Sequence, residues 1–187
     1  AKGRSVAEDL ARLTEVRSAI GADADLIADA NCMMNFDTAR RFIEQGHDLG
    51  LTWLEEPVVA NDIGNLTKLS RMGVPLGAGQ MEQSLERHRA LRLAGVKVIQ
   101  PNAVFLGGFQ KAINSALDAA SKGAGISMAG GWDFVNLHWI CGALNDGAVE
   151  LHRAQFRIAR LLMRDMPEIA NGQINVPDRL GLGLDPD

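Results

Sequence analysis

The chain has 187 residues, 47% of them hydrophobic and 22% charged, a composition typical of a soluble globular domain with a hydrophobic core. A net charge of −4 and the lack of any apolar run near the roughly 20 residues that span a bilayer argue against nucleic acid and membranes as partners. The two cysteines have neither metal-binding nor redox spacing, which indicates free thiols and a cytoplasmic location.

Amphipathic helices alternate with short apolar runs along the chain. The first helix is expected from Ser5 to about Ile20, because Ser5 and Glu8 form an S-x-x-E capping box ahead of apolar residues at helical spacing. Further helices are expected over residues 38–46, 66–72, 85–94, 109–121 and 135–144. Strands are expected over residues 26–31, 52–57, 75–79, 96–102, 125–130 and 148–152.

This alternation predicts an α/β fold with a parallel sheet, either an open doubly wound layer or a closed (β/α) barrel. Polar residues end successive strands at Asp29, Glu55, Gln80, Asn102 and Glu150, and the first four follow one another at intervals of 26, 25 and 22 residues. In a barrel such strand ends converge on one mouth. The G-x-G-x-x-G fingerprint of dinucleotide-binding open sheets does not follow the first strand. We therefore favour a TIM-type barrel.

Three of these strand-end residues have side-chain oxygens that suit a hard cation. Asp29, Glu55 and Gln80 would together form an oxygen-only ligand set, which favours Mg²⁺. The alternative is that such residues cap helices or pair with basic side chains. Their regular spacing favours the metal.

Four motifs carry a resemblance to a known family. They are D-A-N at residues 29–31, W-L-E-E-P at 53–57, G-A-G-Q at 77–80 and Q-P-N-x-x-x-x-G-G at 100–108. The chain resembles the barrel domain of the enolase superfamily, and more narrowly its mandelate racemase/muconate lactonizing branch. The resemblance implies abstraction of the proton α to the carboxylate of a small-molecule substrate, followed by racemisation, cycloisomerisation or loss of water. It also implies Mg²⁺, which offsets the charge that develops on the carboxylate.

By this resemblance Asp29 and Glu55 match the first two metal ligands. Gln80 stands at the third position, where relatives usually carry an acid, and its neutral amide would bind Mg²⁺ more weakly. Glu82 could approach the same ion if the strand stays extended, since residues two apart share a face; alternatively it is a solvated loop acid.

Two neighbours of these ligands also receive roles. Glu56 is expected to point away from the metal, toward the helix layer, where a hydrogen bond or a basic partner must satisfy it. Asn31, two residues after Asp29 and so on the same strand face, is expected to contact a bound water or the substrate.

The catalytic base is the largest departure from the family pattern. Asn102 stands where racemase-like members carry a catalytic aspartate, and Gly130 lies near the place of their partner histidine. An asparagine cannot act as a general base at neutral pH, so this pair is missing. The family's alternative base is a lysine of a K-x-K strand end, for which Lys2 is the candidate remnant; otherwise Lys2 is an exposed terminal lysine.

Four more residues are candidates for the site. His138 could act in catalysis, although a histidine with apolar neighbours on a helix is often a packing residue. Glu150 matches an acid that polarises the substrate carboxylate in relatives. Trp132 and Asp133, in the G-G-W-D turn, could line the substrate pocket.

We count six βα units, whereas the family barrel has eight strands and a separate capping domain. Residues 1–152 are therefore expected to form a partial barrel, and residues 153–187 a C-terminal helix and return segment that packs toward the cap. Such an arc would expose a parallel edge unless a partner covers it, and we expect a longer active protein that forms a homo-oligomer.

The predicted activity is that of a Mg²⁺-dependent lyase or isomerase. Dehydration of an acid sugar or hydroxy acid is favoured because the pair of bases that racemisation needs is missing. The alternatives are a racemase or cycloisomerase of the same branch, or a non-catalytic relative or inactive fragment that keeps the fold.

Overall fold

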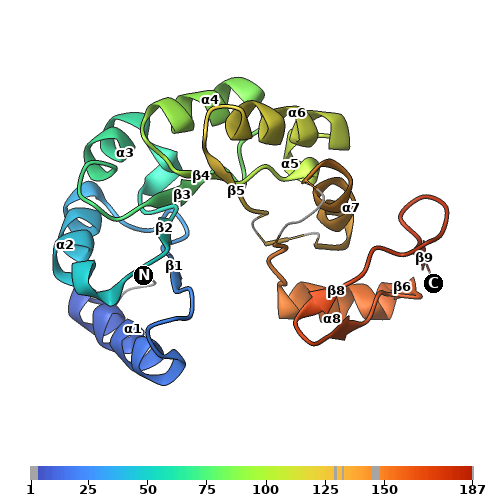
Figure 1. Ribbon diagram of the computed structural model, residues 1–187, viewed down its shortest axis with the longest axis horizontal. Coiled ribbons are helices and arrows are strands. Elements are labelled where there is room, and N and C mark those ends of the chain that lie inside the picture. Colours follow the sequence, from blue (N-terminus) through green and yellow to red (C-terminus); the bar gives the residue numbers. More distant parts are fainter. Residues whose placement is uncertain (1–3, 129, 132, 145–147, 187) are drawn as a thin grey trace.

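The computed structural model of the protein describes residues 4–128, 130–131, 133–144 and 148–186. Its main sheet has five parallel strands, each paired with its neighbour in sequence. They are β1 (Ile27–Asp29), β2 (Trp53–Glu55), β3 (Leu76–Ala78), β4 (Val98–Ile99) and β5 (Gly125–Ile126). The strands line the inside of an open arc and the helices its outside (Figure 1). A doubly wound sheet would reverse its strand order at a switch point, so the sequential order confirms the barrel-type fold.

Helices connect these strands. They are α1 (Val6–Ile20), α2 (Phe36–Gly46), α3 (Ile63–Leu69), α4 (Leu85–Leu93), α5 (Ala103–Leu106), α6 (Phe109–Ala120), α7 (Asp133–Leu144) and α8 (Arg153–Leu162), with 3₁₀ turns η1 (His47–Leu49) and η2 (Val59–Asn61). The capping box of α1 is present as predicted: Ser5 Oγ accepts from the Glu8 N–H, and Glu8 accepts from the Ser5 N–H. The short helix α5 was not predicted. No helix within the described ranges is both long and apolar enough to cross a membrane.

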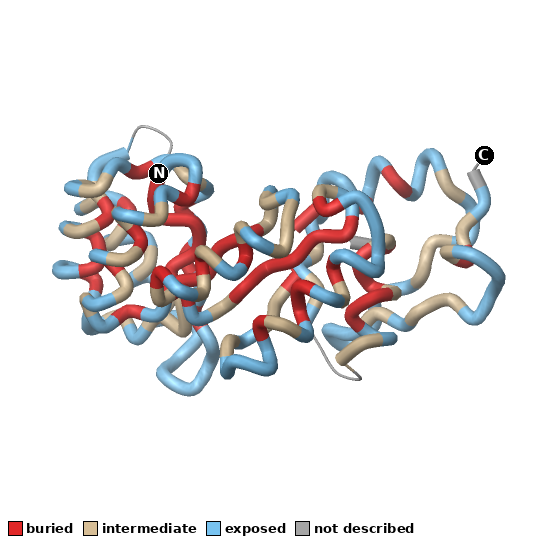
Figure 2. Tube along the Cα trace, turned by 90° about the horizontal axis from the view of Figure 1, so that it is seen from above, coloured by how far each residue is buried: buried red, intermediate tan, exposed pale blue. Residues whose placement is uncertain are grey.

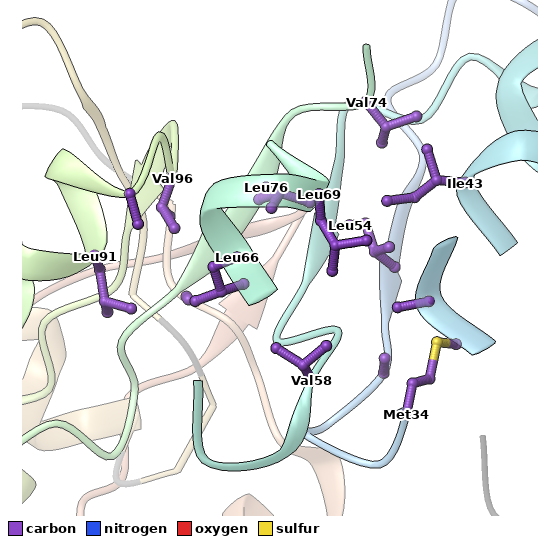
Figure 3. Close-up of a cluster of buried hydrophobic side chains, with 14 of the residues drawn as sticks. Met34, Ile43, Leu54, Val58, Leu66, Leu69, Val74, Leu76, Leu91 and Val96 are labelled. Carbon is purple, nitrogen blue, oxygen red and sulfur yellow. The ribbon is translucent and has the colours of Figure 1, made fainter. Parts of the chain in front are cut away.

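The hydrophobic core lies between the sheet and the outer helices. Leu54 of β2 and Leu76 of β3 are fully buried and pack near Leu66 and Leu69 of α3 and Ile43 of α2 (Figure 3). Each such side chain stabilises the fold by about 1.5–3 kcal/mol. Because neighbours on a strand point to opposite faces, this packing leaves the residues on either side of Leu54 to face the inside of the arc. Buried residues run through the interior, whereas the C-terminal segment is mostly exposed (Figure 2).

The prediction of a sixth strand over residues 148–152 is wrong in this structure. Val149 forms only an isolated parallel bridge with Met128, and the Glu150 N–H donates to the Met128 carbonyl at 3.3 Å. The chain then enters α8, where His152 Nδ1 accepts from the Gln155 N–H at 3.2 Å. A helix cap therefore replaces the rest of the strand ladder.

The C-terminal segment contains α8, as expected, and two short antiparallel pairs. These are β6 (Met163–Arg164) with β9 (Asp185–Pro186), and β7 (Ile169–Ala170) with β8 (Gln173–Ile174). Packing of this segment toward a capping domain stays a prediction.

Candidate metal and substrate site

The carboxyl ends of β1 and β2 bring two acidic residues together. The strands pair in register, with Ile27 opposite Trp53 and Asp29 opposite Glu55. Adjacent strands lie about 4.8 Å apart, and register partners in a parallel pair point to the same face. Asp29 and Glu55 therefore lie side by side at the end of the sheet, as the spacing of the two residues predicted.

Glu55 opens into a cavity of about 400 Å³ on the inward face of the sheet, which we call the inner cavity. Its polar lining comprises Asp29, Glu55, Gln100, Ser127 and Glu150, with Trp53 among the apolar residues. Trp53 lies against Gly77 of β3, where an added Cβ would sit 2.6 Å from the indole ring. A glycine at this position therefore makes room for the Trp53 ring to approach β3 this closely.

Glu55 is a buried carboxylate in a negative environment. Only 6% of its surface is exposed. Burial is the main cause that raises its pKa to about 7, with a further contribution from the nearby Asp29 and Glu150, whereas hydrogen bonds from Gln100 and Trp53 oppose the rise. Trp53 Nε1 donates to Glu55 Oε2 at 3.3 Å.

No lysine or arginine forms an ion pair with Asp29 or Glu55 in the described parts of the chain. A cation at this position would offset the uncompensated charge of Glu55.

Gln100, the residue after β4, belongs to the site although the sequence pattern assigns it no role. It is 1% exposed and lines the inner cavity. Its amide hydrogen-bonds to Glu55, while its buried Oε1 has no hydrogen-bond partner. A buried acceptor without a donor costs about 1–3 kcal/mol, so this atom fits a ligand that carries a hydroxyl or a bound water. The signal that could have identified it is its position as the first residue of the Q-P-N motif.

Gln80 reaches the site from a turn rather than from the strand itself. β3 ends at Ala78, and Gln80 lines a second cavity of about 210 Å³, the rim cavity, together with Asp29, Asn31, Gly130 and Glu150. Gln80 Nε2 donates to the Gly130 carbonyl, which leaves Oε1 as its ligand atom. Glu150 Oε2 accepts from the Gly130 N–H at 2.5 Å. The Gly130 peptide therefore joins Gln80 to Glu150.

Asp29 and Glu150 line both cavities, which makes the inner and rim cavities parts of one site. Within the described ranges, no three His, Cys, Asp or Glu side chains are grouped closely enough to hold a metal. A complete set of protein ligands would therefore need the amide oxygen of Gln80 beside Asp29 and Glu55.

The expected position of Asn31 on the strand face is wrong, because β1 ends at Asp29 and Asn31 has a φ of +51°. It nevertheless belongs to the site. Its N–H donates to Asp29 Oδ1 at 2.7 Å and its Nδ2 donates to Asp29 Oδ2 at 3.0 Å. Asn31 therefore orients the Asp29 carboxylate.

Glu82 does not follow the extended path that would make it a ligand. Gly79, at a φ of +125°, turns the chain after β3. Arg87 then donates to Glu82 through Nε at 2.8 Å and Nη2 at 2.9 Å. Glu82 lines neither the inner nor the rim cavity.

Asn102 is a structural residue here. It is fully buried; its Oδ1 accepts from the Val104 N–H at 3.0 Å and caps α5. The same oxygen accepts from Asn136 Nδ2 at 3.1 Å, and Asn102 Nδ2 donates to the Gly131 carbonyl at 3.2 Å. These hydrogen bonds engage both polar atoms of the Asn102 side chain, and Asn102 itself lines neither cavity.

His138 also lies apart from the cavities. Its Nε2 donates to the Leu182 carbonyl at 3.1 Å, which ties α7 to the C-terminal segment. Lys2 and Trp132 lie outside the described residues. Asp133 is the first residue of α7, and its side chain is likewise outside the described part.

The family model described as enolase C-terminal domain-like matches residues 1–187. Arabinonate dehydratase of Saccharolobus solfataricus is 27% identical over 96% of this chain and 50% of its own length. L-talarate/galactarate dehydratase of Salmonella typhimurium is 30% identical over 95% of this chain and 44% of its own length. The crystal structure of L-talarate dehydratase from Polaromonas sp. JS666, complexed with Mg and L-glucarate, superposes with a TM-score of 0.86 at 28% identity, covering 100% of this chain and 51% of that one. The chain thus spans about half the length of the curated relatives it matches.

Proposed function

This chain belongs to the enolase C-terminal domain-like family, and from this membership we propose that it forms part of a Mg²⁺-dependent enzyme that removes water from an acid sugar or a related hydroxy acid. The observation that carries the proposal is the register pairing of Asp29 with the buried Glu55, which puts two carboxylates beside a cavity with no basic partner among the residues that the structure describes. The dehydratase relatives and the neighbour complexed with Mg and L-glucarate support it.

Asp29, Glu55 and the Oε1 atom of Gln80 would hold the Mg²⁺ ion. When bound, Mg²⁺ supplies positive charge that offsets the charge developing on a substrate carboxylate as the α-proton leaves. Asn31 orients Asp29 through two hydrogen bonds, and Trp53 orients Glu55 through one. The donor set fits the ion because it consists of oxygens and because the burial of Glu55 calls for a cation.

The polar lining of the two cavities favours a substrate with several hydroxyl groups. Gln100 Oε1 can accept a hydrogen bond from a hydroxyl, and Glu150, which accepts from the Gly130 N–H, lines the inner cavity together with Asp29. An acid sugar offers a carboxylate for the metal and hydroxyls for these acceptors. This supports an acid sugar over an apolar carboxylate.

Loss of water is favoured over racemisation because racemisation needs a base that removes the proton on one face of the α-carbon and an acid that returns a proton on the opposite face. Asn102, at the position of one such acid/base group in racemase-like relatives, serves as a helix cap, and its amide side chain is not basic.

The test is a screen of the full-length protein against acid sugars with Mg²⁺, with loss of one water detected by mass spectrometry. Asp29→Asn and Glu55→Gln should each lower activity at least about 100-fold, because each removes a charged ligand. Asp48→Asn is the matched control, since Asp48 is a fully exposed carboxylate far from both cavities.

Two outcomes would contradict the proposal. A product of unchanged mass would identify a racemase or cycloisomerase. A wild-type protein that neither binds Mg²⁺ at millimolar concentration nor converts any acid sugar would identify a non-catalytic relative.

A further inference from the structure

The loops after β1 and β2 contain a cluster of backbone conformations that are unfavourable for side-chain-bearing residues. Of the seven non-glycine residues with positive φ in the described chain, five lie here: Asn31, Cys32, Glu56, Ala60 and Asn61, at φ values of 51°, 56°, 39°, 53° and 47°. Each costs conformational free energy that the surrounding contacts must offset. These two loops, residues 30–35 and 56–62, directly follow the candidate ligands Asp29 and Glu55.

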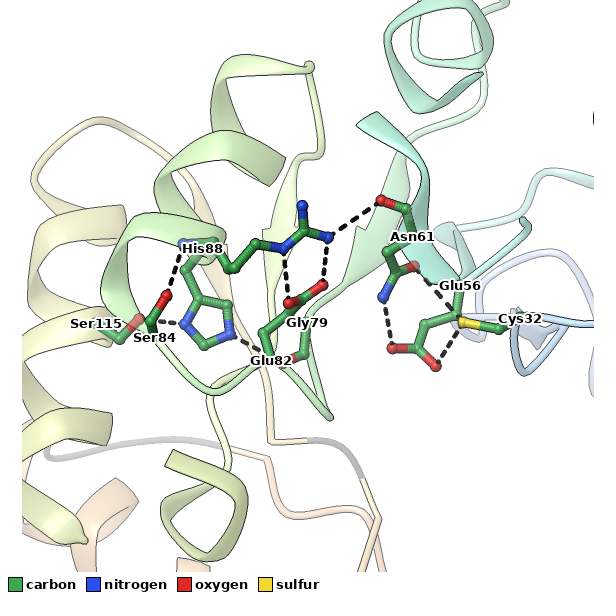
Figure 4. Close-up of polar contacts among 9 residues, drawn as sticks. Cys32, Glu56, Asn61, Gly79, Glu82, Ser84, His88 and Ser115 are labelled. Atoms are coloured by element: carbon green, nitrogen blue, oxygen red, sulfur yellow. Dashed lines mark hydrogen bonds and ion pairs between the residues drawn. The ribbon is translucent and has the colours of Figure 1, made fainter. Parts of the chain in front are cut away.

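Glu56 lies at the centre of the contacts between the two loops. It is 1% exposed, and Asn61 Nδ2 donates to its Oε1 at 3.1 Å. From the loop after β1, the Cys32 N–H donates to the Glu56 carbonyl at 2.7 Å, and the Cys32 thiol donates to Glu56 Oε2 at 3.5 Å. Figure 4 shows the hydrogen bonds that Cys32 and Asn61 donate to the Glu56 carboxylate. Glu56 thus joins both loops through its backbone and its side chain.

The same cluster extends to the turn that carries Gln80. Arg87 holds Glu82 with two hydrogen bonds, and its Nη2 also donates to the Asn61 carbonyl at 3.5 Å (Figure 4). The Glu56 N–H donates to the Gly77 carbonyl of β3 at 2.9 Å. All three ligand-bearing segments are therefore connected behind the cavities.

We propose that Glu56 and Asn61, which contact each other within the loop after β2 and both contact Cys32 of the loop after β1, are positioning residues. Their contacts with Cys32 fix the spacing of the two loops, and through it the distance between Asp29 and Glu55. Only the expected effect on metal affinity rests on the function proposed above; the effect on the spacing of the loops does not. The positive φ of Glu56 directs its side chain between the loops, while Glu55 faces the cavity. Without the Asn61 contact, the buried carboxylate would lose its amide donor and the loops could move apart.

The test compares two glycine substitutions in the same loop of the full-length protein. Asn61→Gly removes the amide donor and suits the local φ of 47°. Ala60→Gly suits a φ of 53° in the same way but removes no hydrogen bond, because the lost group is a methyl, and this methyl is exposed. One measurement is hydrogen exchange of the metal-free protein. The other is Mn²⁺ binding followed by electron paramagnetic resonance.

We expect Asn61→Gly to accelerate exchange at Cys32, in the other loop, and to weaken Mn²⁺ binding about tenfold. Ala60→Gly should leave exchange at Cys32 unchanged and change Mn²⁺ affinity by less than about twofold. Equal effects of the two variants, or exchange that changes only within residues 58–62, would overturn the proposal.

If the wild-type protein binds no Mn²⁺, the proposed function fails, and the exchange pattern alone decides whether Glu56 and Asn61 hold the loops. If Asn61→Gly does not fold, Glu56→Gln replaces it: Asn61 and Cys32 donate to different oxygens of the Glu56 carboxylate, and in glutamine one of these oxygens becomes an NH₂ group that cannot accept. Faster exchange at Cys32 in this variant supports the proposal, and unchanged exchange refutes it.

Discussion

Asp29 and Glu55 occupy the same register position at the last residues of β1 and β2, so their carboxylates leave the sheet side by side. Asp29 is exposed, whereas Glu55 is only 6% exposed. The electrostatic cost of bringing the two charges together therefore falls mainly on Glu55. This relationship connects the fold to the proposed chemistry, because a divalent cation is the simplest group that offsets two adjacent negative charges.

The stability of the metal-free protein should depend on the ionisation of Glu55. Its pKa in the fold, about 7, lies above the ordinary value of 4.5, so between these values the folded protein binds more protons than the unfolded chain. The contribution of Glu55 to the free energy of unfolding is therefore fully present below pH 4.5 and falls, by at most about 3 kcal/mol, as pH rises through 7. Urea unfolding in the presence of a chelator measures this dependence.

Glu55→Gln should remove this pH dependence, whereas Glu168→Gln, at an exposed glutamate, should keep it. Saturating Mg²⁺ should also reverse the trend, since the ion binds the ionised carboxylate and its affinity falls as pH drops below 7. A pH profile that is the same in wild type and Glu55→Gln would contradict the assignment.

Gln80→Glu should change stability and metal affinity in opposite directions. The new carboxylate cannot donate to the Gly130 carbonyl, so the metal-free protein should lose about 1–3 kcal/mol of unfolding free energy. The added charge should strengthen Mg²⁺ binding about tenfold in isothermal titration calorimetry. Gln83→Glu is the control, because it adds the same charge at an exposed glutamine three residues away. If both variants bind Mg²⁺ equally well, Gln80 is not a ligand.

Gly79→Ala should destabilise the turn that carries Gln80. Gly79 has a φ of +125°, and an added Cβ would lie 2.9 Å from the ring of His88. That buried ring is held in place, with Nε2 donating to the Gly79 carbonyl at 2.9 Å and Nδ1 hydrogen-bonded to Ser115 Oγ. We expect a loss of about 2–4 kcal/mol in thermal or urea unfolding.

Gly21→Ala separates the two causes of this loss. Gly21 has a φ of +80° but no atom within 4 Å of an added Cβ, so only the backbone penalty of about 1 kcal/mol applies. Similar losses at both positions would show that the His88 contact has no effect.

The two cysteines should differ in reactivity. Burial, followed by the nearby Glu56, raises the pKa of the Cys32 thiol to about 12, so almost no thiolate forms at pH 8. Cys141 is exposed on α7. A thiol reagent should label Cys141 first in the native protein, and Cys32 only after unfolding, as measured by peptide mass spectrometry. Asn61→Gly should increase Cys32 labelling if it opens the loops.

Much of the architecture was predictable from local patterns. Apolar periodicity and the capping box located α1, and the alternation of strands and helices indicated the barrel-type sheet. The regular spacing of Asp29 and Glu55 predicted their meeting, because both end a parallel strand and register follows from the packing of Leu54 and its neighbours. The expectation that a hydrogen bond satisfies Glu56 is also confirmed, but its partners Asn61 and Cys32 come from two loops and not from the helix layer that was expected.

Predictions beyond the strand ends were less successful. Glu82 could approach the ion only from an extended strand, but the turn at Gly79 brings it to Arg87. Asn102 was assigned to a catalytic position, but it is buried as a helix cap. In both cases the partner comes from a segment whose position follows from a turn or from another helix.

The sequence by itself determined which residues end the strands, because alternation along a strand and helical periodicity are local properties of a chain. Only the tertiary structure decided where the side chains beyond those ends point. Gln80 meets Gly130 across fifty residues, and Gln100 lies buried beside Glu55 with an unpartnered oxygen. These contacts depend on backbone turns at positive φ and on partners from distant strands, which no local pattern encodes.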